Sequence, residues 1–256
     1  MKNIPEINIE DIPEFATDDQ IKDRQFEFDC LINNWTDELL SLRKPKFTHK
    51  FDLSNFADDF IHLAYGESES VRDNFKSDFI SLINPAFPKE AFNNLFVRLN
   101  RRSPKDYKIH IHTVDEAFES ISSSMRCIDD ISFLRYHKQP IIIYFSEYDW
   151  EIPEREFRCF VKNKKLIAVT QYEGTKIKEY PENCIEEVKQ KIKDFSGKVI
   201  RAAQLDTFVF DVFFKKDNCH FLEINPYGLS DPCFFINYKN VERGGFAYQK
   251  TEIIKI

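Results

Sequence analysis

Three polar side chains interrupt the otherwise apolar stretch DVFFKKDNCHFLEINPYG, a pattern typical of two strands around a polar turn. Asp211 lies in the first strand, and Glu223 and Asn225 lie in the second. If Asp211 and Glu223 face each other, their Cβ atoms lie roughly 5 Å apart, and the two carboxylates repel unless a positive group lies between them. Oxygen ligands without His or Cys suit Mg²⁺, which commonly binds one or two protein carboxylates together with substrate phosphates. The spacing therefore predicts a magnesium site formed by Asp211, Glu223 and Asn225.

This interpretation depends on the register of the hairpin. A turn formed by KKDNC places Phe214 opposite His220, and counting back along both strands then places Asp211 opposite Glu223. The alternative is that one strand face is exposed to water and that the two acids are ordinary surface charges. The many neighbouring Phe residues favour instead a strand pair that is buried on much of both faces.

A basic segment, FVRLNRRSPKDYK, precedes the hairpin in the sequence. Its cations are Arg98, Arg101, Arg102, Lys105 and Lys108, and its one acid is Asp106. Because arginine forks and lysine charges suit phosphate oxygens, this density in an acidic protein predicts an anionic ligand. Two alternatives stay open: a solvated basic turn before a strand, and a single-stranded RNA site in which Phe96 and Tyr107 stack on bases.

A second candidate for the phosphate site is the strand EFRCFV. Strand alternation places Glu156 and Arg158 on one face, where an ion pair between them would point towards a cleft. The alternative is an exposed salt bridge with a structural role only. Together, a carboxylate site and a basic site on separate elements describe a cleft for a metal and a nucleotide.

The composition of the chain argues against several classes of protein. The chain of 256 residues has only 6 Gly and contains neither GxGxxG nor GxxxxGK[ST], which argues against the usual dinucleotide fold and the P-loop NTPases. A net charge of −7 argues against a general nucleic-acid binder. No apolar run is long enough to span a bilayer, and the six Cys show no CxxC spacing. We therefore expect a soluble, cytoplasmic protein with reduced thiols and no membrane partner.

Hydrophobic periodicity predicts helices in the first half and an antiparallel sheet with interspersed helices in the second. The expected helices cover residues 19–42, 70–83, 113–125 and 183–197, and the expected strands include 46–53, 107–112 and a hairpin over 156–172 with a KNKK turn. The segment RGGF is expected to be a C-terminal loop. The fold class is therefore α+β, with two lobes whose antiparallel sheets enclose a nucleotide cleft. We expect a tail over 1–18, a helical region with a small lobe over 19–145, and a C-terminal lobe with the metal-binding hairpin over 146–256.

Four segments, FVRLNRRSPKD, IPEREFRCFVKNKKLIAVTQY, FVFDVFF and FLEINPYG, resemble in that order the cell division cycle protein 123 (D123) family, a divergent branch of the ATP-grasp fold. The resemblance implies that Asp211, Glu223 and Asn225 bind Mg²⁺ with ATP, and that adenine lies against the connection between the lobes. The residues implied to contact the nucleotide are Arg98, Lys105 and Arg158 with the adjacent acids Asp106 and Glu156, and, around adenine, Phe145, Ser146, Glu147 and Tyr148. The sequence departs from the eukaryotic pattern at Arg98, Arg101 and Arg102, which replace Lys, Trp and Ser, and at Glu223, which replaces Asp.

The resemblance also implies a function. The eukaryotic family assists assembly of translation initiation factor 2 by binding its gamma subunit, so we expect an ATP-dependent assembly factor with that subunit or an analogue as its client. The alternative is an ATP-dependent ligase that modifies a protein, peptide or RNA through an acyl phosphate. A third hypothesis is a nucleotide-bound interaction module without turnover.

Overall fold

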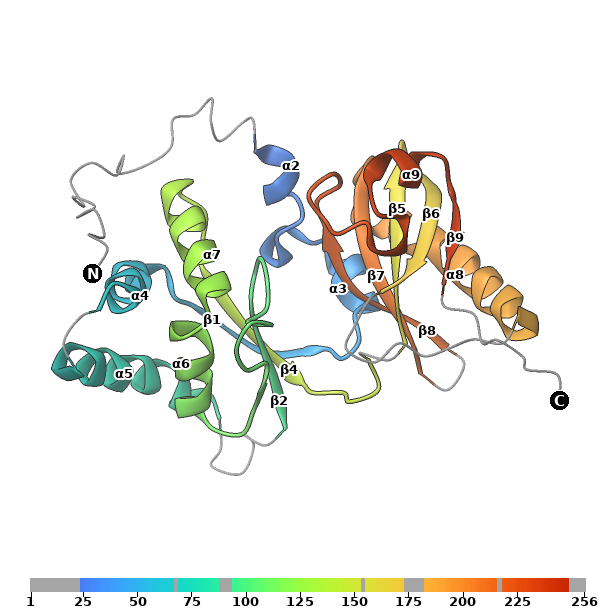
Figure 1. The fold of residues 1–256 in the computed structure, drawn as a ribbon. Coiled ribbons are helices and arrows are strands. Elements are labelled where there is room, and N and C mark those ends of the chain that lie inside the picture. The colour runs from blue at the N-terminus through green and yellow to red at the C-terminus, as the bar shows by residue number, and fades with distance from the viewer. Residues whose placement is uncertain are drawn as a thin grey trace, which may run out of the picture. The chain divides into compact units, whose positions relative to one another are not determined.

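The computed structural model of the protein describes residues 24–66, 69–87, 94–152, 155–172, 182–215 and 218–248. These residues form two compact units, each described below by itself (Figure 1). The first unit includes Phe47–Ser146, and the second combines Phe26–Lys46 with the chain from Glu147 onward. The segment Phe26–Lys46 thus belongs to the second unit, whereas we expected it to belong to one region over 19–145. The predicted tail over 1–18 lies outside the described residues.

The first unit contains a four-stranded sheet in the order β1-β4-β2-β3, in which β1 pairs with β4, and β2 with β3, in antiparallel fashion. The strands are β1 (Phe47–Asp52), β2 (Leu95–Leu99), β3 (His110–Ile111) and β4 (Ile142–Glu147). The helices are α4 (Ala57–Ala64), α5 (Glu69–Ile83), α6 (Val114–Ser122) and α7 (Met125–Tyr136), with 3₁₀ turns η3 (Ser54–Phe56) and η4 (Asn84–Ala86). The predicted strand over 46–53 and the helix over 70–83 are confirmed. The predicted strand over 107–112 is reduced to β3.

Aromatic side chains form the core between the helices of the first unit. The Phe60 and Phe75 rings meet edge to face with centroids 4.7 Å apart, and Phe118 lies 5.4 Å from Phe75 and 5.5 Å from Phe79. Phe60, Phe79 and Phe118 are completely buried. Edge-to-face contacts of this kind add about 0.5–1.5 kcal/mol per pair beyond the burial of the rings. This cluster accounts for part of the high Phe content.

Helix α7 was not predicted; the sequence pattern instead predicted that the preceding helix continues to residue 125. Instead α6 ends at Ser122, and Ser124 starts the new helix because its hydroxyl oxygen accepts a hydrogen bond from the Cys127 amide at 3.1 Å. The same hydroxyl donates to Asp106 at 2.5 Å, and Asp106 also accepts from the Arg126 amide at 3.0 Å. Asp106 thus binds the amino-terminal end of α7, where a negative charge is favourable.

The second unit contains a five-stranded sheet in the order β8-β7-β5-β6-β9. The strands are β5 (Glu156–Lys162), β6 (Lys165–Gln171), β7 (Phe208–Lys215), β8 (Asn218–Asn225) and β9 (Gly245–Ala247), and all pairs are antiparallel except β6 with β9. Helix α8 (Glu182–Ala203) packs against β6 and β8 (Figure 1). The KNKK turn is confirmed, because Asn163 and Lys164 both have positive φ, at 52° and 60°, as a two-residue type I′ hairpin requires.

The helix predicted over 19–42 is wrong as a continuous element. The described part consists of α2 (Gln25–Phe28), the 3₁₀ turn η2 (Ile32–Asn34) and α3 (Asp37–Leu42). Thr36 separates the last two, because it has an extended backbone and its hydroxyl oxygen accepts from the Leu39 amide at 3.0 Å. A Thr at this position caps a helix better than it continues one.

Two further expectations differ from the structure. Helix α8 does not end near Gly197 but continues to Ala203, because Val199 and Ala202 extend its buried face; the roughly 1 kcal/mol cost of an internal glycine is smaller than the gain from that burial. The RGGF segment is not a loop alone, since its glycines, at φ 79° and 128°, lead into β9. The remaining elements of the second unit are the 3₁₀ turn η6 (Cys233–Phe235) and α9 (Tyr238–Glu242).

In the part of the chain that the structure describes, we find no helix with the length and hydropathy needed to cross a membrane.

Replacing the α7 cap should destabilise the protein measurably. We expect Ser124→Ala to lower the free energy of unfolding by about 1–2 kcal/mol, because the variant loses the hydroxyl that binds both Asp106 and the Cys127 amide. The matched control is Ser123→Ala, one residue earlier and exposed, which should stay within about 0.5 kcal/mol of the wild type. Urea denaturation measures both, and equal effects of the two substitutions would contradict the capping role.

The Asp106 contact should also depend on pH. Burial alone raises the pKa of Asp106, but hydrogen bonds from Ser124 and the Arg126 amide outweigh it, so the folded-state pKa lies below the ordinary value of 3.8. The stabilisation is therefore present above 3.8 and is lost as the pH falls through the lowered pKa. We expect Asp106→Asn to be less stable than the wild type at neutral pH, and the difference to shrink in acid; a difference that is independent of pH would refute the ionised contact.

Candidate metal and nucleotide site

The β7–β8 hairpin places Asp211 opposite Glu223, as the sequence predicts, but by a different route. Near the turn Phe213 faces His220, so the register there differs by one residue from the prediction. A bulge between Val212 and Asp211 then inserts one extra residue, Leu222, into β8 and restores the predicted pairing. The predicted pairing of Phe214 with His220 is therefore wrong, whereas the pairing of the two acids is confirmed.

The three proposed metal ligands meet at one point of the hairpin. The Asn225 amide nitrogen lies 3.1 Å from Asp211 Oδ2 and 3.4 Å from Glu223 Oε1. One positively polarised group therefore lies within reach of both carboxylates. Asp211 is completely buried, and Glu223 and Asn225 are half-buried.

Arg158 neutralises the buried carboxylate. It lies directly opposite Asp211 across the β5–β7 pair, and its Nε and Nη2 donate to Asp211 Oδ1 and Oδ2, both at 2.9 Å. Its Nη1 donates to the Asp231 carbonyl at 3.0 Å, and its guanidinium lies 4.7 Å from the centre of the Tyr172 ring. Burial alone lowers the pKa of Arg158, but the charge and hydrogen bonds of Asp211 outweigh it and hold that pKa well above its ordinary value. The expected partner, Glu156, is thus replaced by Asp211; Glu156 is itself buried, opposite Phe213.

The donor set fits Mg²⁺. Two carboxylates and an amide are hard oxygen ligands, and the Asn225 side chain can present its oxygen by turning its amide over. Each Asp211 oxygen has two lone pairs, so the pairing with Arg158 does not exhaust the carboxylate. Across the described residues no three His, Cys, Asp or Glu side chains gather as a metal cluster. The hairpin therefore offers two anionic ligands, which matches an ion that completes its shell with water and phosphate oxygens.

In the first unit, the arginines of the basic segment have partners within the protein. Arg98 is 4% exposed, and its Nε and Nη2 donate to the carbonyls of Leu99, at 3.2 Å, and Arg101, at 3.0 Å. Arg101 and Arg102 both bind the completely buried Asp130 of α7, at 2.5 Å and 2.7 Å. The sequence could not pair these arginines with Asp130 because it did not predict α7. This arrangement favours a structural role for a large part of the basic segment.

The other predicted residues of the first unit are Lys105 and Asp106, both exposed, and Phe145 and Ser146, both buried in β4. Among the residues that the structure describes, the buried Ser146 hydroxyl has no hydrogen-bond partner, so it has capacity for a ligand. In the second unit Glu147 is exposed, and the Tyr148 ring packs edge to face on Trp150 at 4.6 Å. The structure thus brings Asp211, Glu223, Asn225 and Arg158 together within one unit, and the roles predicted for the remaining residues stay predictions.

Known proteins resemble this chain in sequence and fold. The D123 family model matches residues 67–253. The translation initiation factor eIF2 assembly protein of Candida albicans is 29% identical over 169 residues, which cover 57% of this chain and 49% of the relative. The protein of the same name from Xenopus laevis is 26% identical over 209 residues, covering 69% and 60%. The chain thus spans about half to three fifths of the length of these curated relatives.

A solved structure has a similar fold. The structure of Cdc123 from Schizosaccharomyces pombe superimposes with a TM-score of 0.64 at 18% identity, covering 91% of this chain and 98% of the other. This likeness in fold and the two sheets, in which most strand pairs are antiparallel, confirm the predicted α+β fold class. Because the family model spans residues 67–253 and so includes the whole Asp211 cluster, the chain belongs to the D123 family.

Proposed function

We propose that the protein binds ATP with Mg²⁺ and acts in the cytoplasm as an assembly factor for translation initiation factor 2 or a related client. The observation that carries the nucleotide part is the convergence of Asp211, Glu223 and Asn225 on one point beside a buried arginine. The printed names of the relatives, which are eIF2 assembly proteins, support the client.

Within the site, Asp211, Glu223 and Asn225 would hold the ion, which when bound neutralises phosphate charge. Arg158 fixes the Asp211 carboxylate through two parallel hydrogen bonds and keeps it ionised in a buried position. Glu223 is half-buried, and its carboxylate accepts from the Asn225 amide. The hairpin thus offers one buried carboxylate and one half-buried carboxylate.

The nucleotide contacts outside the hairpin belong to the same proposal. Lys105 is exposed and carries a point charge suited to a phosphate, and Arg98 and Asp106 flank it. The backbone from Phe145 to Tyr148 would bind the adenine edge, and Glu156 in β5 is a further expected contact. The pairing of Arg101 and Arg102 with Asp130 weakens the RNA hypothesis, because it occupies two of the cations that an RNA backbone would need.

Removing the half-buried carboxylate of Glu223 should weaken metal-dependent nucleotide binding. We expect Glu223→Gln to bind ATP in Mg²⁺ about tenfold more weakly, because one of two anionic ligands is lost, a change of about 1.4 kcal/mol. Binding measured in EDTA should not change. Isothermal titration calorimetry with and without Mg²⁺ makes the comparison.

The choice of variant matters for this experiment. Asp211→Ala would leave the buried Arg158 without its carboxylate partner and lower the free energy of unfolding by about 3–5 kcal/mol. An effect of this variant on metal binding could therefore not be separated from its effect on stability. The matched control is Glu187→Gln on α8, whose exposed carboxylate pairs with Lys191 one turn away. Identical Mg²⁺ dependence in Glu223→Gln and the wild type would overturn the site.

The client hypothesis predicts a complex without consumption of nucleotide. We expect the protein to co-elute in gel filtration with the purified gamma subunit of a eukaryotic translation initiation factor 2 in Mg²⁺ and ATP, and the complex to weaken with Glu223→Gln. Chromatography of the nucleotide should show ATP unchanged. Release of ADP or AMP without a stable complex would contradict the assembly-factor proposal and support a ligase.

A further inference from the structure

The turn between β8 and α9 contains an isoleucine in an unfavourable backbone conformation. Ile236 has φ 69° and ψ −40°, and the Asn237 amide donates to the Phe235 carbonyl at 2.8 Å. These values describe a γ-turn with positive φ, a rare and strained conformation. Among the described non-glycine residues with positive φ, Ile236 alone is branched at Cβ, and such residues adopt this backbone region least readily. The position therefore carries strain that a glycine would not have.

The neighbours of Ile236 hold the strained conformation in place. The Phe235 carbonyl accepts a second hydrogen bond, from Asn240 Nδ2 at 2.8 Å, and the Phe235 ring packs edge to face with the buried Phe160, with centroids 6.2 Å apart. On the other side Asn237 caps α9, because its Oδ1 accepts from the Asn240 amide at 3.0 Å. The turn is therefore fixed on both sides of Ile236.

The side chain of Ile236 gains little from packing within the protein. It is 80% exposed, the highest value among the large hydrophobic residues that the structure describes. Strained residues persist where the surrounding structure forces their conformation, and they cluster at functional sites. Burial does not account for an isoleucine at this position, whereas contact with a partner would.

A second exposed apolar side chain lies in the same loop. Leu229 is 56% exposed. The loop segments that carry Leu229 and Ile236 meet at the Tyr227 and Tyr238 rings, whose centroids lie 4.8 Å apart. Each tyrosine stands two residues from one of the exposed side chains. The loop between β8 and α9 thus presents two aliphatic groups to solvent from one ordered support.

This loop is also tied to the proposed metal site. Arg158, which binds Asp211 through two hydrogen bonds, donates from Nη1 to the Asp231 carbonyl at 3.0 Å. Asp231 in turn holds the start of η6, because its Oδ1 accepts from the Cys233 amide at 2.8 Å. A protein bound at Ile236 would therefore contact the segment that Arg158 joins to Asp211.

From these observations we propose that Ile236 is the main docking contact for the protein client, with Leu229 as a second contact, and that it inserts into an apolar pocket of that client. This inference rests on the proposed assembly-factor function and adds the surface through which the client binds. Insertion removes apolar area from water, and a β-branched side chain on a fixed turn has little freedom to lose.

A membrane is a poorer fit for this surface. Two aliphatic side chains bury little area in a bilayer, and a net charge of −7 repels anionic lipids.

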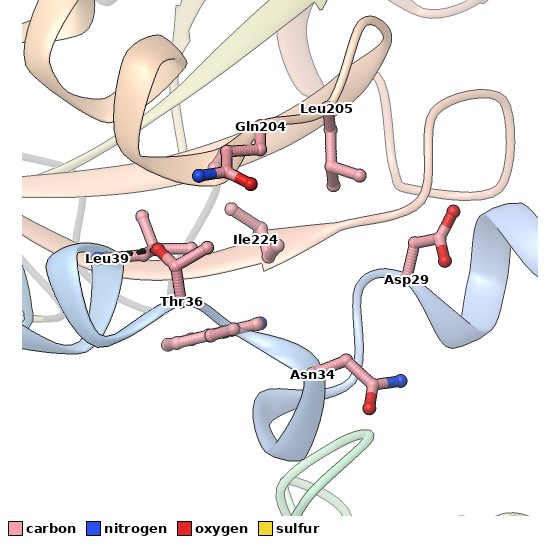
Figure 2. Close-up of a pocket in the computed structure, with 9 residues that line it drawn as sticks. Asp29, Asn34, Thr36, Leu39, Gln204, Leu205 and Ile224 are labelled. Atoms are coloured by element: carbon pink, nitrogen blue, oxygen red, sulfur yellow. Dashed lines mark hydrogen bonds between the residues drawn. The ribbon is translucent and has the colours of Figure 1, made fainter.

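A second copy of the chain is another alternative partner. The second unit contains a pocket of about 190 Å³, with Leu205 and Ile224 in its wall (Figure 2). Sites for whole ligands occupy ~300–1,000 Å³, so this pocket suits a single side chain. Ile236 bound in the pocket of another copy would make a head-to-tail contact, which builds open filaments unless it closes into a ring. A different protein as the partner avoids this outcome and is the occupant we favour.

The test separates docking from stability. In Ile236→Gly, relief of strain exceeds the entropy that glycine adds to the unfolded chain, so we expect the thermal unfolding temperature to rise by about 2–4 °C. The same variant should bind the purified gamma subunit of a eukaryotic translation initiation factor 2 at least about tenfold more weakly in calorimetry with Mg²⁺ and ATP. A packing role alone would give the opposite pair of results, a lower unfolding temperature and an unchanged complex.

Further variants locate the contact. Ile236→Ala keeps a Cβ, so it should weaken the complex to a similar degree without the rise in unfolding temperature. Leu229→Ser should weaken the complex about threefold. The matched control is Val71→Ala on α5, an exposed β-branched residue of the first unit, which should leave the affinity within about twofold. Equal weakening by Val71→Ala and Ile236→Gly would refute a contact at this loop.

The outcomes distinguish the docking contact from the function on which it rests. Ile236→Gly should bind ATP in Mg²⁺ as the wild type does, because Ile236 is not a proposed ligand. A wild-type complex that Ile236→Gly leaves unchanged would overturn the docking contact and leave the assembly-factor proposal standing. Failure of the wild type to form any complex would overturn both.

Two measurements on the protein without the subunit address the other partners. The protein should elute as a monomer in gel filtration, and oligomers that disappear in Ile236→Gly would identify a second copy as the partner. Co-sedimentation with vesicles of phosphatidylcholine and phosphatidylserine that is lost in the same variant would identify a membrane contact. Either result would overturn the client as the occupant.

Discussion

The second unit depends on the buried ion pair between Arg158 and Asp211. Removing two charges from water costs several kcal/mol per ion, so such a pair persists only when its geometry is good and its remaining donors are bound. Both conditions hold: two parallel hydrogen bonds of 2.9 Å join the side chains, the third nitrogen binds the Asp231 carbonyl, and Tyr172 covers the guanidinium. Because Asp231 follows Asn225 closely, the same arginine ties the central strands to the loop beyond the proposed metal ligands. A sheet stabilised by apolar contacts alone would not need this pair, and its position beside Glu223 and Asn225 is the strongest physical argument for a ligand there.

The first unit also contains a buried carboxylate that binds arginine. Asp130 is completely buried in α7, and Arg101 and Arg102 approach it from the loop after β2. Here the charge density of the basic segment therefore attaches a loop to a helix, and only part of it remains for an anionic ligand. A local count of cations does not reveal this division, because the acid that binds them is 28 or 29 residues further along the chain.

Local patterns predicted the elements whose signals are local. Strand alternation and the KNKK turn predicted the β5–β6 hairpin, since Asn163 and Lys164 accept the positive φ of a type I′ turn. The Thr36 cap broke a helix that apolar spacing alone had joined. Helix α7 was missed because its start depends on Asp106, far back in the chain, as well as on Ser124. The bulge at Leu222 has no sequence signal, because an apolar residue in an apolar strand looks the same paired or bulged. The predicted pairing of Asp211 with Glu223 was therefore correct only because the register error near the turn and the missed bulge cancelled.

The bulge sets the register of β8, and this register decides which side chains of β8 lie beside Asp211. A slip of one residue in β8 would exchange Ile224 with Glu223 and Asn225, removing the polar groups from Asp211 and burying them where Ile224 now packs. The register is held on one side by β7 and on the other by the segment before β1, where Arg43 bridges to Phe221 and the Lys44 amide donates to the Phe221 carbonyl at 2.9 Å. Phe221 in turn packs on Trp35. These contacts between the N-terminal segment and β8 thus help to hold the strand in the register that places Glu223 and Asn225 beside Asp211.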